Sequence, residues 1–278
     1  MSDRRRRKLA WFCLSMMLPV LPLVSSAAEG GATRVQLNDH AYARLKDRIV
    51  GRFGTAVPHQ WGETVTGVKT RLDTGEKIIA LTMDACGSQQ GMGFDAELLA
   101  FLERKQIPAT LFINTRWIES NRAAFDRLAA NPLFEIANHG RQHKPASVTG
   151  RSVYGIEGTQ NVAELVDEIE LGAAKIAALS GHRPSFYRSG TAYYDDVAVQ
   201  VAEALGQQVV GFSVLGDKGA TYTRDEVKKA LLSATAGDII IVHMNHPESG
   251  TRAGVMDAIP ELLRRGLRFV RLSDRPLR

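Results

Sequence analysis

The chain has 278 residues, of which 35 are Lys or Arg and 30 are Asp or Glu. Five of the basic residues and one acidic residue lie in residues 1–28, so residues 29–278 carry 30 basic and 29 acidic side chains, a net charge of +1. The overall pI of 9.3 is therefore no indication of nucleic-acid binding, and we expect no nucleic-acid partner. A length of about 250 residues after that segment suits one domain.

Residues 1–28 have the organisation of a secretory signal peptide. A basic cluster at 4–8 precedes an apolar run at 9–24 and a stretch of small residues at 25–28. The apolar run is shorter than the roughly 20 residues that a bilayer span needs. We expect cleavage after Ala28 and a periplasmic or secreted protein, by the general or the twin-arginine route. The alternative is an uncleaved anchor, the one case in which we expect contact with a membrane.

The predicted signal peptide also contains one of the two cysteines. Cys13 lies in the predicted signal peptide, which leaves Cys86 as the single thiol of an exported protein. One cysteine excludes an internal disulfide framework.

The remaining chain divides into an extension and a domain. Residues 29–75 have only scattered apolar positions and are expected to form a loosely structured extension that packs on the domain at 76–278. In that domain, short apolar runs alternate with amphipathic helices, which favours parallel strands with helical crossovers. About seven strands without a dinucleotide-binding fingerprint predict an α/β fold, a distorted (β/α) barrel. The predicted strands are 78–83, 109–113, 134–138, 185–187, 209–214, 239–242 and 267–272; the predicted helices begin at Asp95 and span 122–130, 159–179, 196–205, 225–234 and 255–265.

Polar side chains follow the predicted strands where each strand ends. These residues are Asp84, His139, Arg188, Asp217 and His243. Singly, each has an ordinary reading as a helix cap, a surface ion pair or a core histidine. Because the carboxyl ends of barrel strands meet on one face, the five together predict a functional site there.

Two histidines in this set suggest a metal. His139 and His143 are four residues apart, and in a helical turn both imidazoles would project on one face and share an ion. Histidine and oxygen ligands with an open position suit Zn²⁺ or a similar first-row ion.

A glycine-rich segment at 87–93 follows the first strand. It lacks the Gly-Lys-Ser/Thr ending of a phosphate loop, and no acidic residue suits a ribose at the next strand's tip, so we expect no nucleotide cofactor. Glycine here would let the backbone bend close to a ligand.

The ordered motifs resemble those of the polysaccharide deacetylases, the NodB homology domain of carbohydrate esterase family four. The resemblance covers Lys77 to Leu272 and is carried by four segments, which are Thr82–Ala85, His139–His143, Phe186–Arg188 and Ile241–His243. The first, third and fourth family motifs diverge. Ala85 stands where the family has a second aspartate that ligates the metal, Ser189–Ala192 follow the arginine, and Leu215–Lys218 lack the usual tryptophan.

The resemblance implies a metal-dependent hydrolase that removes N-acetyl groups from an extracytoplasmic N-acetylated polysaccharide or oligosaccharide, such as peptidoglycan or an exopolysaccharide. It implies that His139 and His143 hold a divalent metal such as Zn²⁺, with Cys86, Asp84 or water as third ligand. Asp84 would be the base, oriented by Arg188, and His243 the general acid. Gly190, through a nearby backbone N–H, and Asp217 and His246 are expected near the substrate. Two alternatives stay open: a catalytically degenerate carbohydrate-binding protein, and an amidase of a non-sugar substrate.

Overall fold

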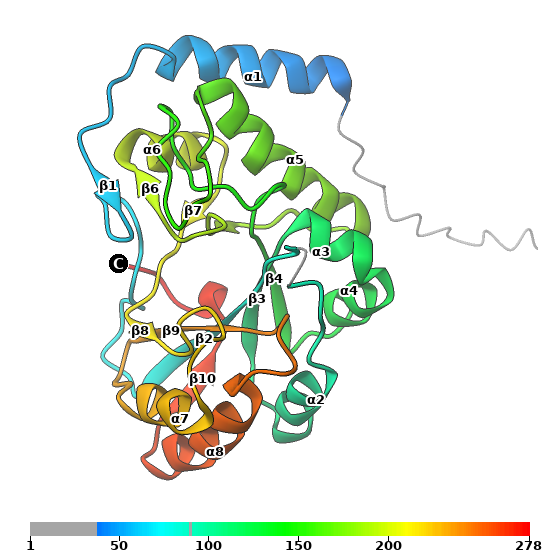
Figure 1. The fold of residues 1–278 in the computed structure, drawn as a ribbon, viewed down its shortest axis with the longest axis vertical. Helices are drawn as coiled ribbons and strands as arrows, with labels where there is room; N and C mark the ends of the chain where they lie inside the picture. Colours follow the sequence, from blue (N-terminus) through cyan, green and yellow to red (C-terminus); the bar gives the residue numbers. More distant parts are fainter. Residues whose placement is uncertain (1–37, 89–90) are drawn as a thin grey trace, which may run out of the picture. The chain divides into compact units, whose positions relative to one another are not determined.

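The computed structural model describes residues 38–278 except 89 and 90 (Figure 1). The predicted signal peptide lies outside these residues. Seven strands form a curled parallel sheet, in the order β7-β5-β4-β3-β2-β9-β8. These strands are β2 Ile78–Ala85, β3 Ala109–Ile113, β4 Phe134–Asn138, β5 Phe186–Tyr187, β7 Gln208–Val209, β8 Val214–Leu215 and β9 Ile239–His243. The predicted distorted (β/α) barrel is confirmed, as a half-barrel of parallel strands.

The sheet is centred on β2, whose eight residues are all buried. Its last residues pair with β3 on one edge and β9 on the other. A further strand, β10 Arg268–Val270, pairs with residues 78–80 of β2, and the short helix η1 Leu272–Asp274 follows. The predicted last strand at 267–272 is therefore shorter than expected.

The predicted strand at 209–214 is wrong as a single element. It is two strands, β7 and β8, which lie at opposite ends of the sheet. The N–H of Val210 bonds to Tyr187 at one end, and the N–H of Ser213 bonds to Ile239 at the other. The residues between β7 and β8 cross the gap of the half-barrel, so one apolar run of the sequence supplies the strands at both edges of the sheet.

Helices follow most strands, as the alternation predicted. They are α2 Ala96–Lys105, α3 Thr115–Ser120, α4 Arg122–Ala129, α5 Val162–Ser180, α6 Asp196–Ala204, α7 Arg224–Leu232 and α8 Thr251–Arg264. The Asp95 side chain caps α2 by accepting from the N–H of Leu98 at 3.0 Å. Gly181 ends α5 in the left-handed region, with φ of 78°. The six-residue helix α3 was not predicted.

The extension is more ordered than the sequence suggested. Residues 39–53 form helix α1 (Asp39–Phe53), so the expectation of a loose segment is wrong there. Its buried face includes Ile49 and Phe53 and packs with residues of α5 and α6. The apolar positions Tyr42, Leu45, Ile49 and Phe53 recur at helical spacing, a signal diluted by the charged residues between them. A second element, β1 Trp61–Gly62, pairs antiparallel with β6 Tyr194–Asp195.

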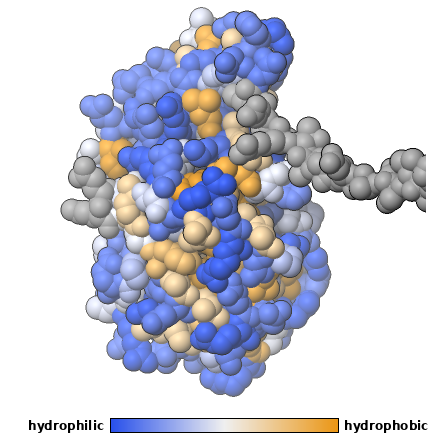
Figure 2. All heavy atoms as spheres, turned by 90° about the vertical axis from the view of Figure 1, so that its right-hand side faces the viewer, coloured by the Kyte–Doolittle hydropathy of each residue, from blue (hydrophilic) through white to orange (hydrophobic). Residues whose placement is uncertain are grey.

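Hydrophilic residues dominate the face that carries α3 and α4, with smaller apolar areas between them (Figure 2). None of the helices in the described residues combines the length and apolarity needed to cross a bilayer.

The packing of α1 predicts that the extension stabilises the domain. Phe53 is 5% exposed, so Phe53→Ala should lower the free energy of unfolding in urea by about 3 kcal/mol through lost burial and a cavity. The exposed Arg48 on the same helix is the control, and Arg48→Ala should change the free energy of unfolding by about 0.5 kcal/mol or less. Equal effects of the two substitutions would contradict the packing role.

Candidate active site

Strand register brings the predicted polar residues to one end of the sheet. Asp84 on β2 is the Cα partner of His243 on β9. His139 follows β4 directly, and its N–H bonds to the carbonyl of Ile113. Arg188 follows β5, and its N–H bonds to the carbonyl of Asn138. Neighbouring parallel strands thus deliver an acid, a cation and two imidazoles to one place.

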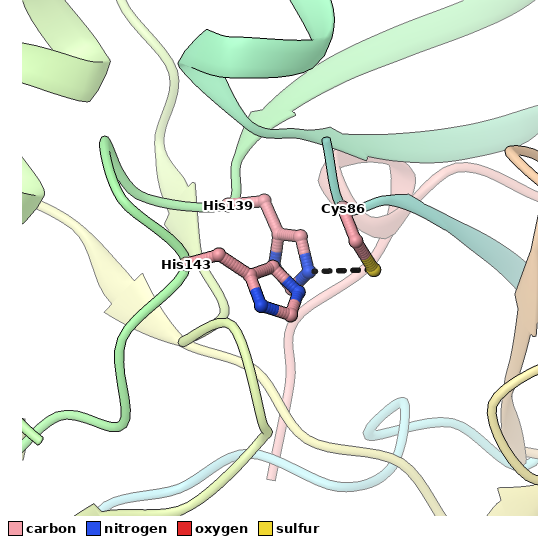
Figure 3. Close-up of side chains that lie close together, drawn as sticks. All are labelled: Cys86, His139 and His143. Carbon is pink, nitrogen blue, oxygen red and sulfur yellow. Dashed lines mark hydrogen bonds between the residues drawn. The ribbon is translucent and has the colours of Figure 1, made fainter. Parts of the chain in front are cut away.

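A cluster of one thiol and two imidazoles stands at the centre of this end (Figure 3). One potential ligand atom from each of Cys86, His139 and His143 lies within 4.8 Å of the other two. The Cys86 Sγ is 3.7 Å from the His139 Nε2. The two rings meet edge to face, with centroids 4.9 Å apart.

The donor atoms of the cluster suit a metal ion. The Nδ1 of His139 lies 2.9 Å from the carbonyl oxygen of Arg188. If this nitrogen carries the proton and donates it there, the Nε2 lone pair faces the cluster. The Nε2 of His143 is buried and has no hydrogen-bond partner in the described residues. Such an orphaned acceptor beside a thiol and a second imidazole fits the nitrogen and sulfur ligands that Zn²⁺ prefers.

The electrostatics of the cluster favour a thiolate. Burial raises the pKa of Cys86, but the charge of His143 and hydrogen bonding from the imidazoles outweigh it and hold that pKa well below its ordinary value. Burial lowers the pKa of His139, and the Asp84 and Cys86 side chains outweigh it and raise that pKa. A metal would compete with protons for the same atoms.

The two histidines do not share a helical turn, contrary to the expectation. Residues 139–144 form a loop in which Gly140 and His143 have φ values of 76° and 65°. The left-handed backbone at His143 turns its ring towards His139, so the imidazoles meet for a reason other than helical spacing.

Two buried residues that the sequence analysis missed hold this loop. The Glu168 carboxylate on α5 accepts from the N–H groups of Gln142 and Lys144. The side-chain amide of Asn114 donates to the carbonyls of His139 and Gly140. Glu168 is one of two glutamates, with Glu170, among the mostly apolar buried residues of α5, and that break in the pattern was the available signal.

Gly190 packs against the loop that carries His143. Its own N–H donates to the carbonyl of Lys144 at 3.3 Å, so an oxyanion would have to bind another N–H nearby. A Cβ at Gly190 would lie 2.3 Å from the carbonyl carbon of His143. The glycine is therefore needed for the close approach of the His143 loop.

Asp84 is fixed by a buried cation. The Arg188 guanidinium donates to Asp84 Oδ1 at 2.8 Å and to Thr82 Oγ1 at 3.0 Å. The other carboxylate oxygen of Asp84 lies 3.6 Å from the His139 Nε2, which places it at the edge of the thiol–imidazole cluster.

His243 is fixed by a buried anion. Its Nδ1 lies 2.9 Å from Asp217 Oδ1, and its N–H and the Thr251 hydroxyl donate to Asp217 Oδ2. Burial lowers the pKa of His243, but the Asp217 charge and hydrogen bond raise it well above its usual value. Asp217 is fully buried, so the expected contact with substrate is corrected to a contact with His243.

The remaining predicted residue is His246. His246 is partly exposed, and its Nδ1 lies 2.9 Å from a Glu248 carboxylate oxygen. The glycines at 91 and 93 let their loop approach Asn245 and Pro247.

Comparisons with known proteins agree with this geometry. Residues 71–210 match the polysaccharide deacetylase family. A peptidoglycan-N-acetylglucosamine deacetylase of Bacillus cereus is 25% identical over 214 residues, which cover 75% of this chain and 93% of that protein. A bifunctional xylanase/deacetylase of Pseudobutyrivibrio xylanivorans is 24% identical over 200 residues, 72% of this chain but only 30% of that protein's length.

Solved structures show the same fold. A peptidoglycan N-acetylglucosamine deacetylase superposes with a TM-score of 0.64 at 19% identity, over 75% of this chain and 92% of that one. A family-four pseudoenzyme from Bacillus anthracis superposes with a TM-score of 0.62 at 18% identity, over 74% and 67%. The fold class is a (β/α) half-barrel, and in this chain a Cys/His/His cluster lies at the carboxyl ends of its strands. The chain belongs to the polysaccharide deacetylase family.

The close contact at Gly190 predicts a loss of metal binding. Gly190→Ala should displace the His143 backbone and lower zinc affinity by about tenfold or more. Gly51 on α1 is the control, because a Cβ there meets nothing within 4 Å. Zinc retained after gel filtration, measured by elemental analysis, checks this, and equal retention in both variants would show that the His143 loop holds no metal.

Proposed function

We propose that this protein is an exported, metal-dependent N-deacetylase of an extracytoplasmic N-acetylated glycan, either peptidoglycan or an exopolysaccharide. The observation that carries the proposal is the convergence of a Cys86–His139–His143 cluster with two oriented proton-transfer groups at the carboxyl ends of neighbouring strands. Membership of the family and the peptidoglycan deacetylase relative support the reaction and the substrate class. Export rests on the signal-like sequence of residues 1–28.

The metal we propose is zinc, held by the Cys86 thiolate and the two imidazoles. Cys86 supplies the negative ligand that Ala85 lacks, and borderline-soft Zn²⁺ accepts sulfur. When bound, zinc polarises an amide carbonyl and lowers the pKa of water, which amide hydrolysis at neutral pH requires.

Asp84 is proposed as the general base. Arg188 holds one carboxylate oxygen, which fixes the orientation of the group and leaves the other oxygen at the edge of the cluster. From there it can take a proton from a water molecule that attacks the acetamide carbon.

His243 is proposed as the general acid. With Nδ1 bonded to Asp217, Nε2 is the nitrogen left for proton transfer, and the Asp217 carboxylate, by raising the pKa of the imidazole, favours its protonated form. It can then protonate the leaving amine, which gives acetate and a free amino sugar. Asp217 acts as a positioning residue through His243.

A second candidate function is glycan binding without catalysis. It is favoured by the missing carboxylate at Ala85. An otherwise intact fold does not guarantee activity. The two candidates differ in whether bound glycan releases acetate.

The acid and base assignments predict a large loss of turnover. Asp84→Asn and His243→Ala should each lower acetate release from N-acetylglucosamine oligomers by about a hundredfold or more, because each removes one proton transfer. The exposed Asp47 and His40 on α1 provide matched controls, and Asp47→Asn and His40→Ala should retain activity. A zinc-loaded, unsubstituted protein that binds these oligomers yet releases no acetate would favour the binding function.

The thiolate assignment predicts a spectroscopic signature. In a chain carrying Cys13→Ser, cobalt-substituted protein should show sulfur-to-cobalt charge-transfer absorption that disappears in Cys86→Ser. Iodoacetamide should alkylate Cys86 slowly in the metal-loaded protein and faster after chelation, because a ligated thiolate is shielded. The absence of the absorption band, together with equal alkylation rates, would assign Cys86 to packing alone.

A further inference from the structure

Three aromatic side chains form a surface cluster that the proposed reaction does not use. The Tyr193 ring lies between Trp61 and Tyr154, with centroid distances of 5.8 Å and 5.6 Å. The Arg151 guanidinium lies 5.1 Å from the Trp61 ring centroid. We call Trp61, Tyr154 and Tyr193, with Arg151, the aromatic platform.

Exposure distinguishes this platform from core packing. Trp117, Tyr187 and Tyr194 are fully buried, whereas Tyr154 is 70% exposed and Trp61 and Tyr193 are partly exposed. Exposed aromatic rings leave apolar surface in water, which is unfavourable unless a ligand covers it.

The platform is assembled from three segments that are distant in the sequence. Trp61 belongs to β1, which pairs with β6 immediately after Tyr193. Tyr154 is at a tight turn, with φ of 55°, in which Val153 and Ile156 exchange backbone hydrogen bonds. Rings brought together from separate segments and held by backbone pairing make a preorganised surface.

The platform is joined by hydrogen bonds to the loops that carry the active-site residues. The carbonyl of Tyr193 accepts from the N–H of Ala146 at 3.0 Å and from the Ser189 hydroxyl at 2.9 Å. Ser189 adjoins Arg188, and Ala146 is three residues beyond His143. Arg188 and Tyr193 are five positions apart in the sequence, which limits their Cα separation to about 18 Å. A short oligosaccharide can span that range.

On this basis we infer that the aromatic platform is a glycan-binding subsite, which holds sugar units of the chain next to the one that reacts. The inference rests on the proposed function and adds to it a preference for polymers over single sugars. The apolar C–H faces of pyranose rings stack on aromatic faces, whose negative potential favours the polarised C–H groups. Arg151 supplies donors for ring hydroxyls or a carboxylate beside the stacked sugar.

The test is the length dependence of glycan affinity. Calorimetric titrations use N-acetylglucosamine oligomers of two and six units on Asp84→Asn protein, so that no turnover occurs. The hexamer should bind more tightly than the dimer. Tyr154→Ala should weaken hexamer binding by about tenfold, the scale of one lost aromatic contact, and the dimer less.

Matched variants isolate the ring. Tyr154→Phe should keep hexamer affinity, because stacking needs the ring and not the hydroxyl. Trp61→Ala should repeat the loss from another segment. Leu263→Ala removes a 40% exposed apolar side chain on α8, outside the platform, and should leave hexamer affinity unaltered.

The outcomes separate this inference from the proposed function. If the unsubstituted protein releases acetate but Tyr154→Ala does not change hexamer affinity, the aromatic platform is not a glycan-binding subsite and the proposed function stands. Tyr154-dependent hexamer binding without acetate release supports the platform and overturns the function. Absence of hexamer binding, or Tyr154-dependent binding to phosphatidylcholine vesicles instead, overturns the inference.

Discussion

The buried guanidinium of Arg188 is the interaction on which the fold and the site both depend. It is fully buried and donates to Thr82 and Asp84 on β2 and to the carbonyls of Val210 and Gly211 in the segment that crosses the half-barrel gap. A buried charge is tolerated only when its donors are satisfied, and removing one partner of such a pair costs about 3–5 kcal/mol. The same cation therefore ties the gap segment to the central strand and sets the orientation of Asp84.

The cluster beside Asp84 shows how strand geometry selects a ligand. Side chains alternate along β2, so Asp84 and Cys86 point to one side and Ala85 points to the other. Ala85 is fully buried in the apolar cluster that contains Ile113 and Trp117. A thiol at 86 can reach the imidazoles, while the small residue at 85 completes the packing behind them. Because a thiolate carries the same charge as a carboxylate, this placement keeps the charge balance of the centre.

The parts of the fold that the sequence predicted are those with a strong local pattern. The apolar run of β2, the cap at Asp95 and the glycine after α5 each specify their element within a few residues. Placing polar residues at strand ends was enough to assemble Asp84, His139, Arg188 and His243. The ring orientation of His143 was not predictable, because it depends on Glu168 and Gly190, which are distant in the sequence. The prediction of a single strand at 209–214 failed for a similar reason. Which strands pair with one another depends on distant residues and not on the local sequence.

The extension belongs physically to the barrel, although its sequence lacks the alternation of the rest. The backbone of Lys69 donates to Val209 and accepts from Gly211, and Arg71 exchanges backbone hydrogen bonds with Arg278. The Lys69 bonds occupy polar groups of the crossing segment that the curled sheet leaves without a neighbouring strand, and the Arg71 bonds hold the C-terminal residue of the chain. The same extension also places Trp61 beside the loop that follows Arg188. A boundary at residue 76 therefore divides the sequence pattern but not the folding unit, and any substrate contact made by Trp61 depends on the pairing of β1 with β6.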